Sequence, residues 1–87
     1  MDKAVVEKIN QKISETLSKK DEIKQIVNSL NKQEVDQNSF AYGIVIGRLY
    51  NSFYYQTKRI LNREPTSEEF SEFLNLLKSH ESEFLKI

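Results

Sequence analysis

Apolar side chains near the amino end of the chain recur at helical spacing. Between Asp2 and Leu17 they fall mostly four residues apart and do not alternate, at Val5, Val6, Ile9, Ile13 and Leu17. This spacing is typical of one face of an α-helix, whereas a strand would place apolar side chains at every second position. We therefore predict a first helix over residues 2–17.

The apolar stripe changes phase after this helix. Residues 18–21 are polar, and the stripe resumes at Ile23 about 80° out of phase with Ile9. We predict a break or kink here, with Ser18 or Asp21 capping a second helix. The alternative is a single bent helix that continues to Leu30.

The next segment lacks any hydrophobic period. Residues 31–38 contain one apolar side chain, Val35, and are predicted to form the longest loop. Asp36, Asn38 or Ser39 can each cap the helix that follows, because short polar side chains accept hydrogen bonds from the first free N–H groups.

Residues 39–63 are the most apolar stretch of the chain and predict one long central helix. At 100° per residue, a stripe of five side chains is expected to face the core: Tyr42, Ile46, Leu49, Phe53 and Ile60. The polar residues gather on the opposite side, at Arg48, Ser52, Gln56, Arg59 and Arg63. Phe40, Ile44, Val45 and Tyr55 place further apolar surface on the sides that should face water. A helix that is apolar all round is normally buried all round.

A last helix begins after Pro65, which disfavours helical geometry in the residue before it. Thr66 is the predicted cap, and Glu69 three residues later completes a capping box. The apolar face of this helix is expected to continue to the end of the chain, through Phe70, Phe73, Leu74, Leu77 and Phe84.

The same stretch, LNREPTSEEFSEFL, resembles the opening of the helix-turn-helix of bacterial sigma factors, in which a similar REPT precedes the first helix. After Leu77, however, the sequence has neither a glycine turn nor a second apolar helix of recognition type. The resemblance ends where DNA contact would occur, so it predicts no DNA-binding function.

These elements predict an all-α fold, a small antiparallel bundle of three to four helices in one domain over residues 1–87. The content of one proline and two glycines suits such a bundle. Arg48, Asn51 and Ser52 interrupt the apolar run, so we expect no membrane span. The first fifteen residues lack the apolar region of a secretory signal, and a cytoplasmic protein is expected.

The overall charge hides a pattern along the chain. Thirteen basic and thirteen acidic residues cancel. Residues 39–63 nevertheless carry four basic side chains and no acid, whereas residues 64–87 carry six glutamates against two lysines. We expect these two helices to lie antiparallel with their charges facing one another.

Two glycines inside the central helix predict a close contact. Gly43 and Gly47 each cost about 1 kcal/mol relative to alanine in a helix interior, so close packing should offset that cost. Either the first or last helix of the same chain packs there, or a second copy does. The predicted interface consists of Phe40, Gly43, Ile44, Gly47 and Tyr55.

The basic side of the central helix suggests a second candidate surface. Arginines pair with phosphates and tyrosine stacks on bases, so an anion or nucleic acid is a possible ligand of this side. Its residues are Arg48, Tyr55, Lys58, Arg59 and Arg63. Salt bridges to the glutamates of the last helix are the favoured alternative, because the chain has no net positive charge.

No catalytic, metal or cofactor motif stands out. His80 and Glu83 have metal-ligand spacing, but two ligands do not make a site. The chain has no cysteine, no HExxH motif and no glycine-rich phosphate loop. We therefore expect no enzyme, no cofactor and no metal, and predict a protein–protein interaction or assembly module. Its expected partner is a second copy or another protein, with nucleic-acid binding as the less favoured alternative.

Overall fold

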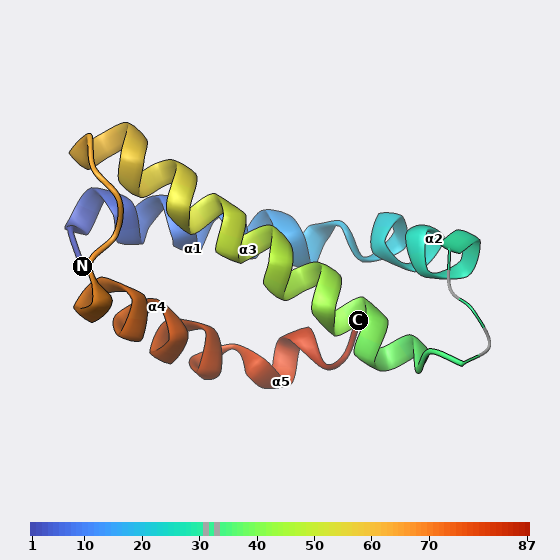
Figure 1. Cartoon of the computed structure of the whole chain (residues 1–87). Coiled ribbons are helices and arrows are strands. Elements are labelled where there is room, and N and C mark those ends of the chain that lie inside the picture. The colour runs from blue at the N-terminus through green and yellow to red at the C-terminus, as the bar shows by residue number, and fades with distance from the viewer. Residues whose placement is uncertain (31, 33) are drawn as a thin grey trace.

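The computed structural model describes residues 1–30, 32 and 34–87, and five helices lie within these ranges (Figure 1). They are α1 (Lys3–Ser18), α2 (Lys20–Leu30), α3 (Gln37–Leu61), α4 (Ser67–Ser79) and α5 (Glu81–Phe84). The predicted all-α fold, a small helical bundle, is confirmed. None of the helices in the described ranges has the length and apolar character needed to cross a membrane.

The predicted break between the first two helices is confirmed at Lys19. Helices α1 and α2 are separate but follow each other along one line (Figure 1). The predicted caps are wrong. The Ser18 hydroxyl donates to the Glu15 carbonyl at 2.6 Å, so it closes the end of α1, and Asp21 lies inside the first turn of α2.

Asp36, one of the three predicted caps, is the residue that caps the start of α3. The Asp36 carboxylate accepts hydrogen bonds from the Ser39 backbone N–H at 2.8 Å and from the Ser39 hydroxyl at 2.7 Å. Residues 31 and 33 of the predicted loop lie outside the described residues. The helix ends at Asn62, whose φ of 58° is left-handed, a conformation that asparagine tolerates better than most residues.

The capping box of α4 is confirmed. The Glu69 backbone N–H donates to the Thr66 hydroxyl at 3.2 Å, and the Thr66 N–H donates to the Glu69 carboxylate at 2.9 Å. The last helix does not continue to the end of the chain, however, because His80 forms a turn between α4 and α5. Phe84 is as deeply buried beyond this turn as Phe73 is before it, so the apolar pattern did not reveal the interruption.

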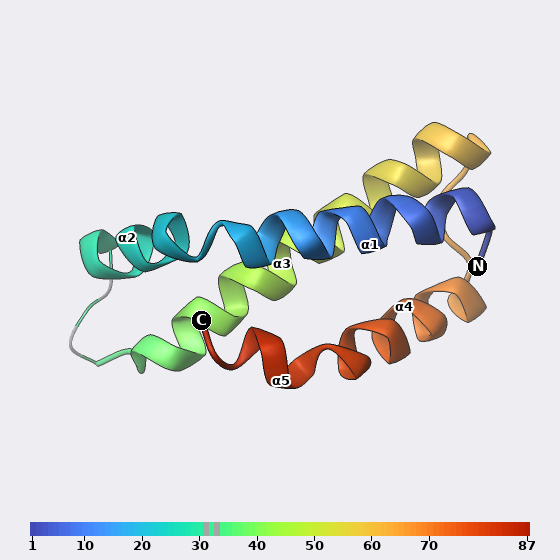
Figure 2. The ribbon, with the colours of Figure 1, turned by 180° about the vertical axis from the view of Figure 1, so that it is seen from behind.

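Helix α3 lies between the other elements. It runs antiparallel to α1 and packs mainly against it, while α4 and α5 follow its other side (Figures 1 and 2). The core contains side chains from every helix: Val5, Ile9, Ile13, Ile23, Val27, Ala41, Val45, Leu49, Phe53, Phe73, Leu77 and Phe84.

The buried face of α3 is rotated from its predicted position. Leu49 and Phe53 are fully buried as expected, but the rest of the face follows Ala41 and Val45 in place of Tyr42, Ile46 and Ile60, which are half-buried. Gln56, expected among the polar residues, is only 5% exposed. Both α1 and α2 pack against α3, and Ala41 lies near Val27 of α2, so the buried face follows the positions of these two helices.

Candidate interaction surface

None of the other described helices covers one side of α3. We call it the outer face; it lies opposite Leu49 and comprises Phe40, Gly43, Ile44, Gly47, Tyr50, Asn51, Tyr54 and Tyr55. In the view of Figure 1, α3 crosses in front of α1, and in the reverse view of Figure 2 it lies behind α1. Tyr55 is 61% exposed and Tyr50 is 46% exposed.

All five predicted interface residues belong to the outer face, although they differ in burial. Gly43, Gly47 and Tyr55 are exposed. Phe40 and Ile44 are half-buried because their inner edges pack against the core. Tyr50 was not among the predicted interface residues, although it is 46% exposed on the outer face.

Among the described residues, the space beside both glycines is open. A Cβ atom added at Gly43 or at Gly47 would have no atom of another described element within 4 Å. Packing of α1 or α4 against these glycines is therefore not what offsets their cost in a helix interior. The open space beside them is available to a group from outside the chain.

The outer face continues into an apolar groove between α3 and α4. Its lining combines both helices: Ile46, Gly47, Tyr50, Phe70, Phe73, Leu74 and Leu77. The two helices meet where the Phe53 and Phe73 rings stack, with centroids 4.4 Å apart and an interplanar angle of 3°. Beside this contact, Phe70 remains 39% exposed and Leu74 42% exposed.

The dimensions of the groove favour a protein side chain as its occupant. Its volume of about 190 Å³ is below the roughly 300–1,000 Å³ that is usual for small-molecule sites. The width of the apolar face of α4 in the sequence also indicates this groove. The apolar arc of α4 spans about 160°, from Leu76 to Leu74, which exceeds the stripe of about 100° that one packing contact covers.

Aromatic contacts fix the tyrosines that border the groove. The Tyr50 and Tyr54 rings meet edge to face at 5.2 Å, and Tyr50 lies 6.2 Å from Phe70. A hydrogen bond with Tyr50 raises the pKa of the Tyr54 hydroxyl above its ordinary value. Tyr54 therefore stays neutral at physiological pH, and this edge of the surface is aromatic and uncharged.

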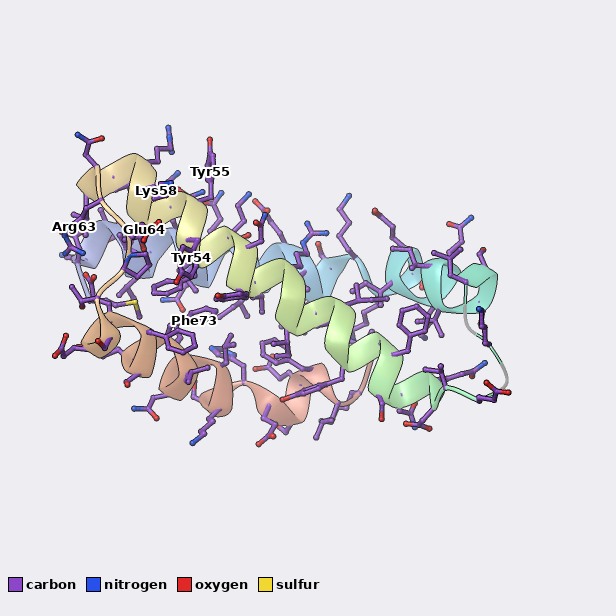
Figure 3. The ribbon with its side chains drawn as sticks, in the orientation of Figure 1. Tyr54, Tyr55, Lys58, Arg63, Glu64 and Phe73 are labelled. Carbon is purple, nitrogen blue, oxygen red and sulfur yellow. The ribbon has the colours of Figure 1, made fainter. Side chains whose placement is uncertain are left out.

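The predicted basic surface is divided. Arg63 forms two hydrogen bonds to the Glu69 carboxylate, at 2.7 and 3.1 Å, and this contact lowers the pKa of Glu69 to about 2. Arg63 follows the last residue of α3, and among the described residues its contact with Glu69 is the single ion pair that joins this segment to α4. Lys58 and Arg59 are exposed elsewhere on α3, and Tyr55 points away from α4 (Figure 3).

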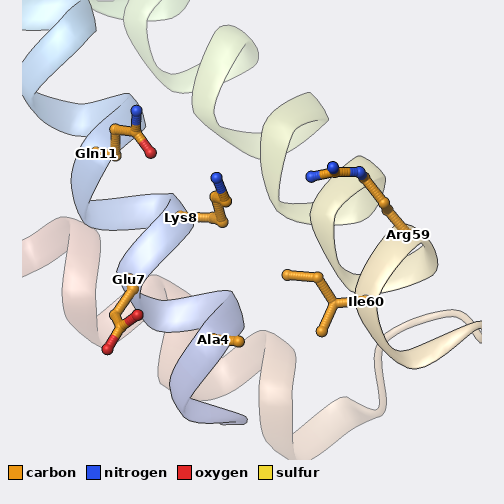
Figure 4. A pocket seen from close by; sticks show the side chains of 6 residues that line it. All are labelled: Ala4, Glu7, Lys8, Gln11, Arg59 and Ile60. Atoms are coloured by element: carbon orange, nitrogen blue, oxygen red, sulfur yellow. The ribbon is translucent and has the colours of Figure 1, made fainter.

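Arg59 lines an open pocket between α1 and α3 rather than an edge shared with α4. The other residues that line this pocket of about 470 Å³ are Ala4, Glu7, Lys8, Gln11 and Ile60 (Figure 4). The basic groups of Arg59 and Lys8 share the pocket with the Glu7 carboxylate. Four of its six lining residues are polar or charged, whereas small-molecule sites are lined mainly by apolar side chains. Nucleic-acid binding by Arg48 and Arg59 stays a prediction.

His80 makes a local contact within the turn that it forms. Its Nδ1 lies 2.8 Å from the Glu83 carboxylate, and its ring packs near Phe84. The described residues contain no group of three side chains that could hold a metal ion. The His80–Glu83 pair therefore serves the turn between α4 and α5.

The comparisons with known proteins give this surface no counterpart. No family model matches the chain, and neither a curated protein nor a solved structure is significantly similar to it. The function is therefore argued from the residues of the surface itself.

Proposed function

We propose that this protein is a small interaction or assembly module that self-associates through the outer face of α3. The observation that carries the proposal is the uncovered apolar surface running from the outer face into the groove beside Gly47 and Tyr50. Exposed tyrosine and phenylalanine side chains of this kind are enriched at protein interfaces, where they provide large contact areas.

The size of the chain favours self-association on thermodynamic grounds. A chain of 87 residues buries only about 60–65% of the surface that its unfolded form exposes, so its intrinsic stability is modest. A second copy covers the same surface on both partners across a twofold axis, the commonest symmetry among soluble oligomers. Dimer formation adds to the stability of the folded chain because only the folded form binds.

The competing nucleic-acid function has less support. Arg63, one of its predicted contacts, already has Glu69 as a partner, so it is not free to bind a phosphate. The remaining basic side chains belong to a chain without net positive charge.

The test measures association of the wild type and of Gly47→Leu. We expect the wild type to sediment as a dimer at concentrations on the order of 500 µM, and leucine at position 47 to block close approach and release monomers. Helicity should be retained because a Cβ atom at position 47 has no described neighbour within 4 Å and because leucine favours a helix more than glycine does. Asn10→Leu, on the exposed side of α1, is the matched control and should remain dimeric.

Two outcomes would overturn the proposal. A wild-type protein that remains monomeric at this concentration does not self-associate. A micromolar, salt-sensitive complex with a short DNA or RNA, weakened by replacing Arg48 and Arg59 with glutamine, would favour the nucleic-acid function instead.

A further inference from the structure

We infer that the dimer is an antiparallel pair of α3 helices with Gly47 on the twofold axis. The inference rests on the proposed function and deepens it, because it fixes the partner as a second copy and fixes the pairing of residues. Three observations on the outer face carry it: its side-chain sizes, its two end charges and the absence of a covering helix.

The sizes of the side chains match in this register. In an antiparallel pair centred on Gly47, residues at equal distances before and after it face each other. Gly47 meets Gly47 of the second copy at the axis, where the space beside it is open. One turn away, the second open position, Gly43, faces Asn51. Ile44 faces the exposed ring of Tyr50, and two turns from the axis Phe40 faces Tyr54, so the small residues lie at the centre of the contact and aromatic rings lie towards its ends.

The charges at the ends of the outer face also match. Asp36 lies eleven residues before Gly47 and Lys58 lies eleven residues after it, both exposed. The antiparallel register places each Lys58 beside Asp36 of the other copy, whereas a parallel pair would bring Lys58 against Lys58. The two helix dipoles also oppose each other in the antiparallel pair, which is the favourable arrangement.

The surroundings of α3 allow this approach. No other described helix lies in front of α3 in the view of Figure 1, and α4 follows its side. Lys58 lies about 16 Å along the axis from Gly47, so the end charges meet when the helices cross at a shallow angle of about 20°. This is the common crossing geometry of antiparallel bundles.

Cysteine cross-linking tests the register without background from native thiols, because the chain contains no cysteine. Gly47→Cys should form a disulfide-linked dimer under mild oxidation, since the two Cα atoms at the axis lie within disulfide range. Asn51→Cys alone should cross-link no faster than the control variant Ser14→Cys, whose cysteine lies at an exposed position of α1. A mixture of Asn51→Cys with affinity-tagged Gly43→Cys should cross-link at least about tenfold faster than either variant alone.

A charge reversal gives a second test that needs no cysteine. Lys58→Glu should weaken the dimer about three- to tenfold, because two such contacts are lost and become repulsive. Arg59→Glu changes the net charge equally but lies towards the pocket with α1, and it should leave the dimer nearly unchanged.

The outcomes separate this inference from the proposed function. Rapid cross-linking of Asn51→Cys with itself would establish a parallel pair and overturn the register. Cross-linking at the Ser14→Cys rate in every variant, with a dimer still observed by sedimentation, would overturn the α3 pairing while self-association stands. A monomeric wild type would overturn both.

Discussion

The two sides of α3 differ in how completely the chain covers them. On the side that packs against α1 and α2, the core is closed: Val45 and Leu49 have no exposed surface, and Gln56 is only 5% exposed. Towards α4, the contact is held by the Phe53–Phe73 stack and by the Arg63–Glu69 pair near the start of α4. Beside these two contacts lies the apolar groove.

This difference shows which part of the apolar surface the fold needs. The closed side removes apolar side chains such as Val45 and Leu49 from water completely, and this burial stabilises the fold. The side towards α4 keeps aromatic side chains in partial contact with water. Apolar surface that stabilises the fold is thus separate from apolar surface that remains available for association.

The largest expected effect comes from removing the ring that joins the two sides. Phe53→Ala deletes a fully buried side chain stacked on Phe73 and should lower the free energy of unfolding by about 3–5 kcal/mol. Tyr50→Ala, on the open side, should cost less than about 1 kcal/mol. Urea unfolding, at a concentration where both variants are monomeric, compares them. Equal losses would contradict the distinction between the two sides.

The same contrast explains what the sequence predicted well. The helices of the described chain, the break near Lys19 and the capping box at Thr66 depend on local spacing and local hydrogen bonds, which one sequence contains. The rotation of the α3 core face towards Val45 depends on where α1 and α2 pack, and an isolated helical pattern does not contain that direction. The groove at Phe70 and Leu74 was not predicted, although the wide apolar arc of α4 indicates it.

A smaller effect is expected at the start of α4. Thr66→Ala removes the cap that accepts the Glu69 N–H and should cost about 1 kcal/mol, while Thr66→Ser should be nearly silent. Because the cap acts on α4, hydrogen exchange should accelerate in α4 more than in α1. Equal urea midpoints for Thr66→Ala and the wild type would show that the Thr66 cap does not stabilise α4.

The smallest effect should come from the charge of Glu69, and it depends on pH. The hydrogen bond from Arg63, followed by that from the Thr66 N–H, lowers the pKa of Glu69 to about 2 from an ordinary value of 4.5. Because the pKa of the folded form is the lower one, the carboxylate stabilises the fold fully above pH 4.5, and this stabilisation is lost as the pH falls towards 2.

Glu69→Gln keeps a side chain suited to the capping box but removes the charge. Its stability deficit relative to the wild type, measured by urea unfolding, should therefore be constant above pH 5 and shrink below pH 4.5. The lowered pKa of Asp36 is common to both proteins and cancels. A deficit that does not change with pH would show that the Arg63–Glu69 pair does not hold α4 to the end of α3.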